Sequence, residues 1–240
     1  MTYRSRIYAK YASVAQGAEL APGLAEIDRW GTAYDAYLRG WLPSAVDAPI
    51  VDVACGYGRL LRFFTERGYT NVTGVDVSPE QVAIARRVHA NVLQGDVIEF
   101  LEGRPGAFAL ITAFDVLEHL DKDEALRFLD ACQGALQPGG HLVVQTPNAD
   151  SPWGLSVRYG DFTHETCFTP NSLAWLLRLC GFQGAEPREQ GPVPRGLASS
   201  VRWLLWQLLR LSMLARNLVE TGSRGSGILT RVFIVRARRP

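Results

Sequence analysis

The chain has 240 residues, of which 47% are hydrophobic and 20% are charged, and its formal net charge is +1. This length allows one α/β domain with a full core and an appendage, and the near-neutral charge gives no sign of a nucleic-acid-binding surface. The four cysteines, Cys55, Cys132, Cys167 and Cys180, form no C-x-x-C pair. This spacing argues against a structural zinc or disulfide framework and favours a cytoplasmic protein.

The chain order predicts one α/β core with two helical additions. Residues 1–48 are helical in pattern and rich in aromatic side chains, and we expect them to form a lid. The core then alternates between strands (49–54, 71–76, 90–94, 107–114 and 140–147) and helices (58–67, 79–88, 97–103 and 122–135), and ends in a helix at 171–180 and a strand at 182–189. Short apolar strands separated by helices predict a parallel sheet covered on both faces. We therefore divide the chain into a lid (1–48), a core (49–190), a hydrophobic helical insertion (191–229) and a final strand (230–240).

The segment Val51–Leu60 holds the clearest functional signal. An apolar strand ends beside Asp52 and continues into a turn that contains Gly56 and Gly58, after which a helix begins. Glycine allows a tight turn and a close approach of a ligand to the backbone. A strand, a glycine-rich turn and a helix N-terminus form the nucleotide-binding unit of doubly wound α/β proteins.

The same segment departs from the dinucleotide fingerprint G-x-G-x-x-G. Leu61 stands where the third glycine is expected, and Ala54 precedes the turn. A nicotinamide oxidoreductase is thus a weaker alternative. We expect Ala54 to have a negative φ angle, which alanine tolerates.

Five motifs in register resemble those of class I S-adenosylmethionine-dependent methyltransferases. They are Val51–Leu60, Val75-Asp76-Val77-Ser78, Gln94-Gly95-Asp96-Val97, Phe114–Leu120 and Leu136-Gln137-Pro138-Gly139-Gly140, the last read as a helix stop and turn. The resemblance covers about residues 45–185 and implies a doubly wound, mostly parallel seven-stranded sheet with an antiparallel last strand. It also implies S-adenosyl-L-methionine as the cofactor and S-adenosyl-L-homocysteine as its product.

In this resemblance Asp76 holds the ribose hydroxyls and Asp96 accepts from the adenine amino group. The full set of implied cofactor-binding residues is Asp52, Ala54, Cys55, Gly56, Tyr57, Gly58, Asp76, Val77, Gln81, Gly95, Asp96, Val97 and Phe114. Structural alternatives remain for the three acids: Asp52 could bond to loop amides, and Asp76 and Asp96 could cap helices.

Methyl transfer from a sulfonium is a direct displacement that needs alignment of the two reactants and exclusion of water. A hydroxyl acceptor benefits from a general base, and the candidates are His119 and His164, with Asp161 and Glu165 placed to orient His164. The family resemblance puts the Leu-Glu-His element against both pockets and the Asp-x-Thr-His element near the acceptor. The alternatives are a packing role for His119 and a loop-ordering role for His164.

A divalent metal is a further possibility at these positions. Asp115, Glu118, His119 and His164 would be its ligands for a catechol-like acceptor. Sequence spacing does not show that they converge, and we assign no metal site.

Residues 198–220 predict an amphipathic helix. Its polar residues, Arg202, Arg210, Arg216, Asn217 and Glu220, fall within one arc, and the remaining face consists of Leu, Val and Trp. Such a face has to be buried, on the body, on a second subunit or at a membrane surface. The arginines argue against a transmembrane helix, and the basic N-terminus leads into no secretory signal. The helix could also roof the acceptor site, and Tyr11 and Tyr37 are candidate pocket residues of the lid.

We therefore predict a cytoplasmic methyltransferase, with peripheral contact at the inner membrane as an option, that methylates a hydroxyl of a small molecule or sugar. The acceptor could be lipid- or nucleotide-linked. Thr146-Pro147-Asn148 and the Asp161–His164 segment resemble small bacterial O-methyltransferases of sugar, polysaccharide or quinone biosynthesis. The alternatives are N- or C-methylation, or a scaffold that binds the donor without catalysis.

Overall fold

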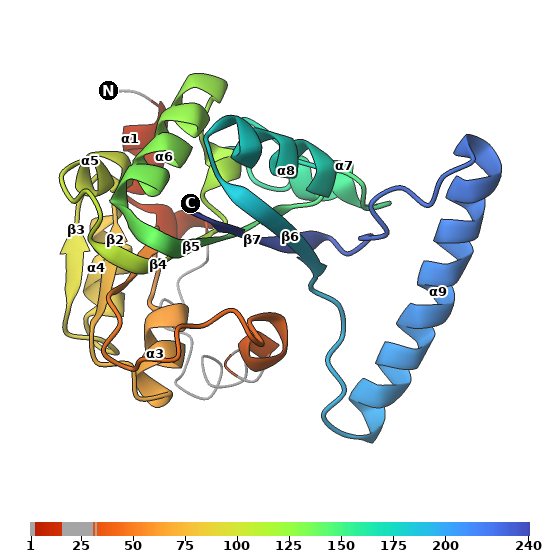
Figure 1. Ribbon diagram of the computed structural model, residues 1–240, viewed down its shortest axis with the longest axis horizontal. Helices are drawn as coiled ribbons and strands as arrows, with labels where there is room; N and C mark the ends of the chain where they lie inside the picture. The colour runs from red at the N-terminus through yellow and green to blue at the C-terminus, as the bar shows by residue number, and fades with distance from the viewer. Residues whose placement is uncertain (1–2, 16–30, 32) are drawn as a thin grey trace.

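The computed structural model describes residues 3–15, 31 and 33–240, and its centre is a seven-stranded sheet (Figure 1). The strand order is β3-β2-β1-β4-β5-β7-β6. The strands are β1 (Ile50–Val53), β2 (Val72–Asp76), β3 (Val92–Gln94), β4 (Phe108–Phe114), β5 (Leu136–Pro147), β6 (Gln183–Glu189) and β7 (Val232–Arg238). The first five strands are parallel, and β7 runs antiparallel to β5 and β6. The predicted doubly wound fold is confirmed.

Helices cover both faces of this sheet. The helices of the described residues are α1 (Tyr3–Tyr8), η1 (Tyr11–Ala15), α3 (Arg59–Glu66), α4 (Pro79–Ala85), α5 (Val97–Glu102), η2 (Leu117–His119), α6 (Lys122–Ala135), α7 (Gly154–Arg158), α8 (Pro170–Leu179) and α9 (Leu197–Thr221). The best-predicted helix is α6, whose start is fixed by a capping box between Asp121 and Glu124.

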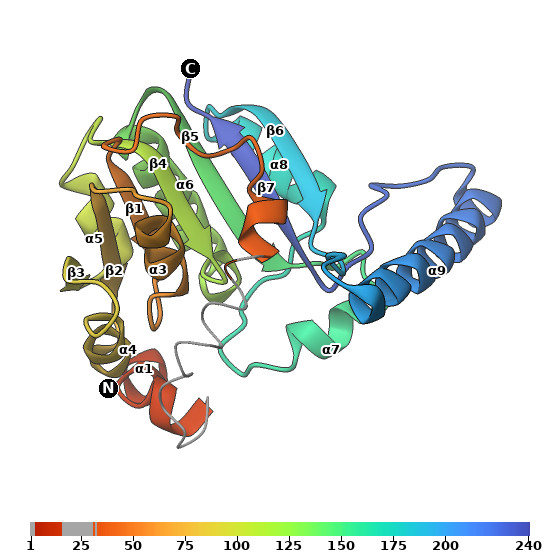
Figure 2. The same ribbon diagram turned by 90° about the horizontal axis from the view of Figure 1, so that it is seen from below.

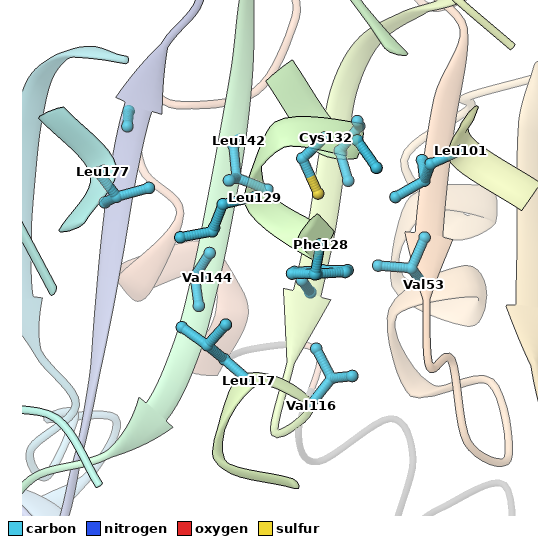
Figure 3. Close-up of a cluster of buried hydrophobic side chains, with 14 of the residues drawn as sticks. Val53, Leu101, Val116, Leu117, Phe128, Leu129, Cys132, Leu142, Val144 and Leu177 are labelled. Carbon is cyan, nitrogen blue, oxygen red and sulfur yellow. The ribbon is translucent and has the colours of Figure 1, made fainter. Parts of the chain in front are cut away.

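Alternate residues of the strands supply two separate apolar cores. Val51 and Val53 of β1 belong to a cluster with α5, α6 and α8, in which Phe128 and Leu129 are fully buried (Figure 3). Ile50, on the opposite face, belongs to a second cluster with α3 and α4. This alternation follows the two-residue period of a strand and explains why the strands are apolar throughout.

Helix α3 packs very closely on the sheet because Gly74 of β2 has no side chain. A Cβ built on Gly74 would lie 2.6 Å from the Leu61 side chain of α3 and 3.1 Å from the Cys55 sulfur. Leu61 is fully buried in this contact. The close packing holds the end of β1 and the start of α3 in one fixed relation.

Two segments differ from the sequence prediction. Residues 136–140, predicted as a turn, form the first part of β5, and the register between β4 and β5 shifts near Phe108. Gly139 has a φ of +77° there, a value that only glycine adopts easily, so the strand can continue through the irregular stretch. The stretch between residues 147 and 171, for which no element was predicted, contains the short helix α7.

Helix α9 stands away from the body, as the two perpendicular views show (Figures 1 and 2). None of its residues is buried, so of the three alternatives for burial of its apolar face, the body of the same chain is not the one found. Among the described residues, no helix has the length and apolar character required to cross a bilayer.

Candidate active site

The turn after β1 uses left-handed backbone conformations at three alternating positions. The φ angles are +55° at Ala54, +53° at Gly56 and +90° at Gly58. The expectation of a negative φ at Ala54 is wrong, because the backbone reverses directly after β1 while the Cys55 amide still bonds to the Val75 carbonyl, 3.0 Å away. Alanine therefore occupies a conformation that favours glycine.

Asp76, at the end of β2, links this turn to the next one. Its two carboxylate oxygens accept hydrogen bonds from the backbone amides of Gly56 at 2.9 Å and Ser78 at 2.8 Å. Ser78, not Asp76, caps helix α4, so the capping alternative for Asp76 does not hold. Each oxygen keeps a lone pair for a further donor such as a ribose hydroxyl.

Asp96 does cap a helix. Its Oδ1 accepts from the amides of Ile98 at 2.8 Å and Glu99 at 3.0 Å at the start of α5. Asp96 also lines the cavity described below. The capping role and a role in recognition of the adenine are thus compatible.

Asp52 lies beneath the turn, almost completely buried. Its Oδ1 accepts a hydrogen bond of 2.6 Å from the Thr112 hydroxyl of β4, whereas the predicted structural alternative placed its partners among loop amides. Burial raises the pKa of Asp52 to about 7, and the negative charge of Asp76 adds to this effect.

A cavity of about 1160 Å³ opens at the carboxyl ends of the parallel strands. The predicted residues that line it are Asp52, Ala54, Cys55, Gly56, Tyr57, Asp76, Val77, Asp96, Val97, Phe114, His119, Asp161 and His164. Gly58, Gln81 and Gly95 are not among the described residues that line the cavity. Gly58 instead allows the start of α3 to approach the end of α4, because a Cβ there would lie 3.4 Å from the Ala85 Cβ and 2.8 Å from the side chain of Val88, just after α4.

His119, in η2, is held by two residues of the segment before α8. Its Nδ1 lies 2.8 Å from the Thr163 hydroxyl oxygen, and that hydroxyl donates to Asp161 at 2.7 Å. Because the only proton of the hydroxyl is directed to Asp161, the Thr163 oxygen accepts from an Nδ1–H of His119. This leaves the lone pair of His119 on Nε2.

His164 has different partners. Its Nδ1 lies 3.1 Å from the Val157 carbonyl and 3.2 Å from the Arg158 carbonyl. The prediction that Asp161 and Glu165 orient the His164 imidazole is therefore wrong, since Asp161 acts on His119 through Thr163. The two imidazole rings nevertheless meet, with centroids 4.9 Å apart.

Burial lowers the pKa of His119 to about 4, and the nearby His164 contributes to the decrease. His119 is consequently neutral at pH 7, and its Nε2 lone pair is available. Against the effect of burial, hydrogen bonds from Thr163 and Tyr11 lower the pKa of Asp161, so its carboxylate is charged.

Glu118, His119 and His164 also offer three ligand atoms within 4.8 Å of one another. Both histidines have Nδ1 engaged and Nε2 available, which is the arrangement common in metal-ligating histidines. These residues could hold a divalent cation, although the sequence interpretation assigned none. Asp115, the fourth candidate, instead bonds through both carboxylate oxygens to the Gln145 amide, at 2.9 and 2.8 Å.

Sequence reasoning missed the role of Thr163 and the individual bonds that connect the N-terminal segment to the site. The Tyr11 hydroxyl donates to Asp161 at 2.8 Å, and both Tyr11 and Tyr37 line the cavity as predicted. Ser13 bonds to Glu80 of α4 at 2.9 Å through both its amide and its hydroxyl. The position of Thr163 between Asp161 and His164 was the feature of the sequence that could have indicated its role. No residue of α9 is among the described residues that line the cavity, so α9 does not roof it.

Comparison with known proteins agrees with this geometry. Residues 28–186 match the model of a family described as a methyltransferase domain. Ubiquinone biosynthesis O-methyltransferases are similar in sequence: that of Cronobacter sakazakii is 32% identical over 115 residues, covering 45% of this chain and 46% of the relative. That of Xanthomonas euvesicatoria is 33% identical over 153 residues, covering 57% of this chain and 63% of the relative. The match thus spans about half the length of such relatives.

Solved structures are similar in fold. An S-adenosylmethionine-dependent methyltransferase from Archaeoglobus fulgidus has a TM-score of 0.64 at 18% identity, covering 99% of this chain and all of that chain. A methyltransferase in complex with its Trm112 activator, from Haloferax volcanii, has a TM-score of 0.68 at 16% identity, with 97% of each chain covered. The chain therefore belongs to the methyltransferase-domain family, and its fold is that of S-adenosylmethionine-dependent methyltransferases.

Proposed function

We propose that the chain transfers a methyl group from S-adenosyl-L-methionine to a hydroxyl of a small molecule or sugar. The observation that carries this proposal is the Asp161–Thr163–His119 hydrogen-bond series, which leaves a neutral imidazole with a free Nε2 lone pair at the cavity. A neutral hydroxyl is a poor nucleophile, so a base of this kind assists oxygen more than it assists an amine that is already unprotonated.

In the proposed reaction the acceptor oxygen attacks the methyl carbon and forms the new O–C bond. The S–C bond breaks at the same time, and its electron pair stays on sulfur to give S-adenosyl-L-homocysteine. The hydroxyl proton passes to Nε2 of His119. Asp161 stabilises the resulting imidazolium through Thr163.

We assign the donor to the side of the cavity formed by β1, β2 and β3. Asp76 would accept from the ribose hydroxyls, and Asp96 would accept from the adenine amino group through the oxygen that does not cap α5. The turn from Ala54 to Gly58 would hold the methionine portion. The acidic character of this side suits a cationic sulfonium.

We further propose that the N-terminal segment acts as a lid over both pockets. Tyr11 contacts Asp161 on the acceptor side, and Ser13 contacts Glu80 on the donor side. Exclusion of water by such a segment would protect the sulfonium and strengthen the electrostatic interactions inside.

The acceptor class is drawn from the relatives, which are named for ubiquinone biosynthesis. A phenolic hydroxyl and a sugar hydroxyl, free or lipid- or nucleotide-linked, are the two acceptors proposed. The test is a methyl-transfer screen with labelled donor against hydroxylated sugars, lipid-linked sugars and phenols. Exclusive labelling of amines would contradict O-methylation and favour the N-methyltransferase alternative.

A variant of His119 tests its proposed role as the base. We expect His119→Ala to lower kcat by about 100-fold or more, whereas the matched control His141→Ala, on strand β5, should leave it unchanged. The same assay after EDTA treatment tests the three-ligand cluster. Loss of activity that Mg²⁺ or Zn²⁺ restores would assign Glu118, His119 and His164 to a cation instead of a base.

A scaffold that only binds the donor is the remaining alternative. It would bind S-adenosyl-L-homocysteine in calorimetry and retain that affinity in His119→Ala, with no methyl transfer to any acceptor in the screen. Two further sequence predictions belong to this proposal: a cytoplasmic location, and a contact of residues 198–220 with either a second copy or the inner membrane surface.

A further inference from the structure

Helix α9 turns a side of mixed polar and apolar residues toward its own chain and an apolar strip toward solvent. Its least exposed residues are Trp206, Gln207, Arg210, Met213, Leu214 and Asn217. Arg210 donates to the Gly227 carbonyl at 2.9 Å and lies 3.4 Å from Glu189, and Asn217 donates to the Ser223 carbonyl at 3.2 Å. Arg210 and Asn217 on this inward side are therefore already bound by their own chain, and the apolar Trp206, Met213 and Leu214 are half-buried on the same side.

The outward side is a continuous strip of apolar residues. Val201, Leu204, Leu208, Leu211, Ala215 and Leu218 follow one another at spacings of three and four residues, so they lie on one face. Leu208 is 58% exposed and Leu211 is 61% exposed. Leu205 (54%) and Val219 (88%) widen the strip on one flank. Exposed leucines in such a row mark an interaction surface.

Positive charge is concentrated around this strip. Between residues 191 and 231 the chain has six arginines (Arg195, Arg202, Arg210, Arg216, Arg224 and Arg231) and one acid, Glu220. This segment therefore carries +5, and because the whole chain carries +1, the remainder carries −4. Arg202 and Arg216 are exposed beside the apolar strip, and Trp203 is 42% exposed. Basic residues and tryptophan beside an apolar face are typical of helices that lie in a membrane interface.

We propose that α9 docks the protein on an anionic lipid surface, with the strip from Val201 to Leu218 in the acyl region and Arg202 and Arg216 at the lipid phosphates. A second copy of the chain fits less well. Two paired helices select each other through opposite charges beside the seam, whereas the charges beside this strip are arginines with a single glutamate, and two such helices would repel each other. The proposal concerns docking and does not depend on the proposed reaction.

The position of α9 relative to the cavity adds a consequence. Gln190, before the insertion, and Arg231, after it, both line the cavity. A helix docked on a bilayer would hold these two ends, and with them the cavity, beside the lipid surface. If the proposed O-methylation is correct, this arrangement favours a lipid-linked acceptor.

The test is co-sedimentation of the full chain with phosphatidylcholine vesicles, with and without replacement of about a third of the lipid by phosphatidylglycerol. We expect binding to the anionic vesicles, and about tenfold or greater weakening in Arg202→Gln/Arg216→Gln. The control Arg87→Gln/Arg178→Gln removes the same charge from exposed positions elsewhere and should bind as the wild type does. Leu208→Asn/Leu211→Asn should also lose binding, unlike Leu179→Asn on α8, a residue 60% exposed.

Absence of binding to anionic vesicles, or equal binding to neutral ones, would overturn the proposal. A dimer in light scattering that Leu208→Asn/Leu211→Asn dissociates would assign the strip to a second copy and overturn it as well. Calorimetry with S-adenosyl-L-homocysteine should be unchanged in all α9 variants, which shows that they are folded. The vesicle experiment therefore tests docking alone, and its failure would leave the methyl-transfer proposal unaffected.

Discussion

The Nδ1 atom of His119 lies 2.8 Å from the hydroxyl oxygen of Thr163, and this contact joins η2 to the segment before α8. The hydroxyl proton is directed to Asp161, so the bond selects one tautomer of His119. Thr163 is buried and is not among the described residues that line the cavity, so it positions His119 through this bond.

Replacement of this hydroxyl should lower the rate without weakening donor binding. We expect Thr163→Val, which keeps the shape, to lower kcat by about 10- to 100-fold and to leave the affinity for S-adenosyl-L-homocysteine unchanged. Thr163→Ser restores the hydroxyl and should recover most of kcat. Equal kcat in Thr163→Val and the wild type would show that the hydrogen-bond series has no catalytic role.

Asp76 provides a prediction for donor binding. Asp76→Asn removes the charge and one acceptor oxygen, and hydrogen bonds to charged groups contribute about 1.5–3 kcal/mol. The Kd for S-adenosyl-L-homocysteine should therefore rise by about 10- to 100-fold in calorimetry. Asp47→Asn, an exposed change of the same type, is the control. An unchanged Kd in Asp76→Asn would remove Asp76 from the donor site.

Ala54 offers a stabilising substitution. Its φ of +55° costs a residue with a Cβ about 1 kcal/mol, so Ala54→Gly should raise the free energy of unfolding by up to that amount. The corresponding rise in Tm is about 2–3 °C for a chain of this size. Ala83→Gly, at an exposed position of α4, should instead lower Tm. A lower Tm in Ala54→Gly would mean that its methyl group stabilises the turn.

Asp52 provides the pH dependence. Its pKa is raised to about 7 in the folded chain from an ordinary value of 3.8, so the folded state binds this proton more tightly than the unfolded state does. The stabilisation is complete below about pH 4 and is lost as pH rises to about 7. Each unit of pKa shift corresponds to about 1.4 kcal/mol.

Asp52→Asn cannot ionise and can still accept from Thr112. Its stability relative to the wild type should therefore increase between pH 4 and pH 7 in denaturant unfolding without ligand. The exposed variant Asp47→Asn should show no such trend. A constant difference between Asp52→Asn and the wild type across this range would show that Asp52 is ionised throughout.

The sequence predicted the features that local pattern determines. The apolar strands, the helix with a capping box at Asp121, and the turn at Gly56 and Gly58 each follow from neighbouring residues, and the structure contains all of them. The alternation of strands and helices along the chain predicts a parallel sheet covered on both faces. Parallel strands place their carboxyl ends at one edge, which is where the predicted site lies.

Features that depend on distant partners were not predicted. The bond from Thr163 to His119 joins two segments that only the folded chain brings together. The φ of Ala54 is imposed by the Cys55–Val75 bond, which overrides the ordinary preference of alanine. The orientation of α9 also required the structure, since its periodicity gives two faces but not which of them meets the body.

The pair formed by Leu61 and Gly74 has a wider meaning for this fold. In the dinucleotide fingerprint, a glycine on the first helix permits close packing of helix and sheet. Here the helix position is a leucine, and the missing side chain is on the adjacent strand β2. The space for the close approach is thus provided by the strand in this chain, whereas the fingerprint provides it on the helix. The glycine motif of the first helix alone therefore separates this chain from dinucleotide-binding proteins. The combined side-chain volume at the contact between the first helix and β2 would instead group them together.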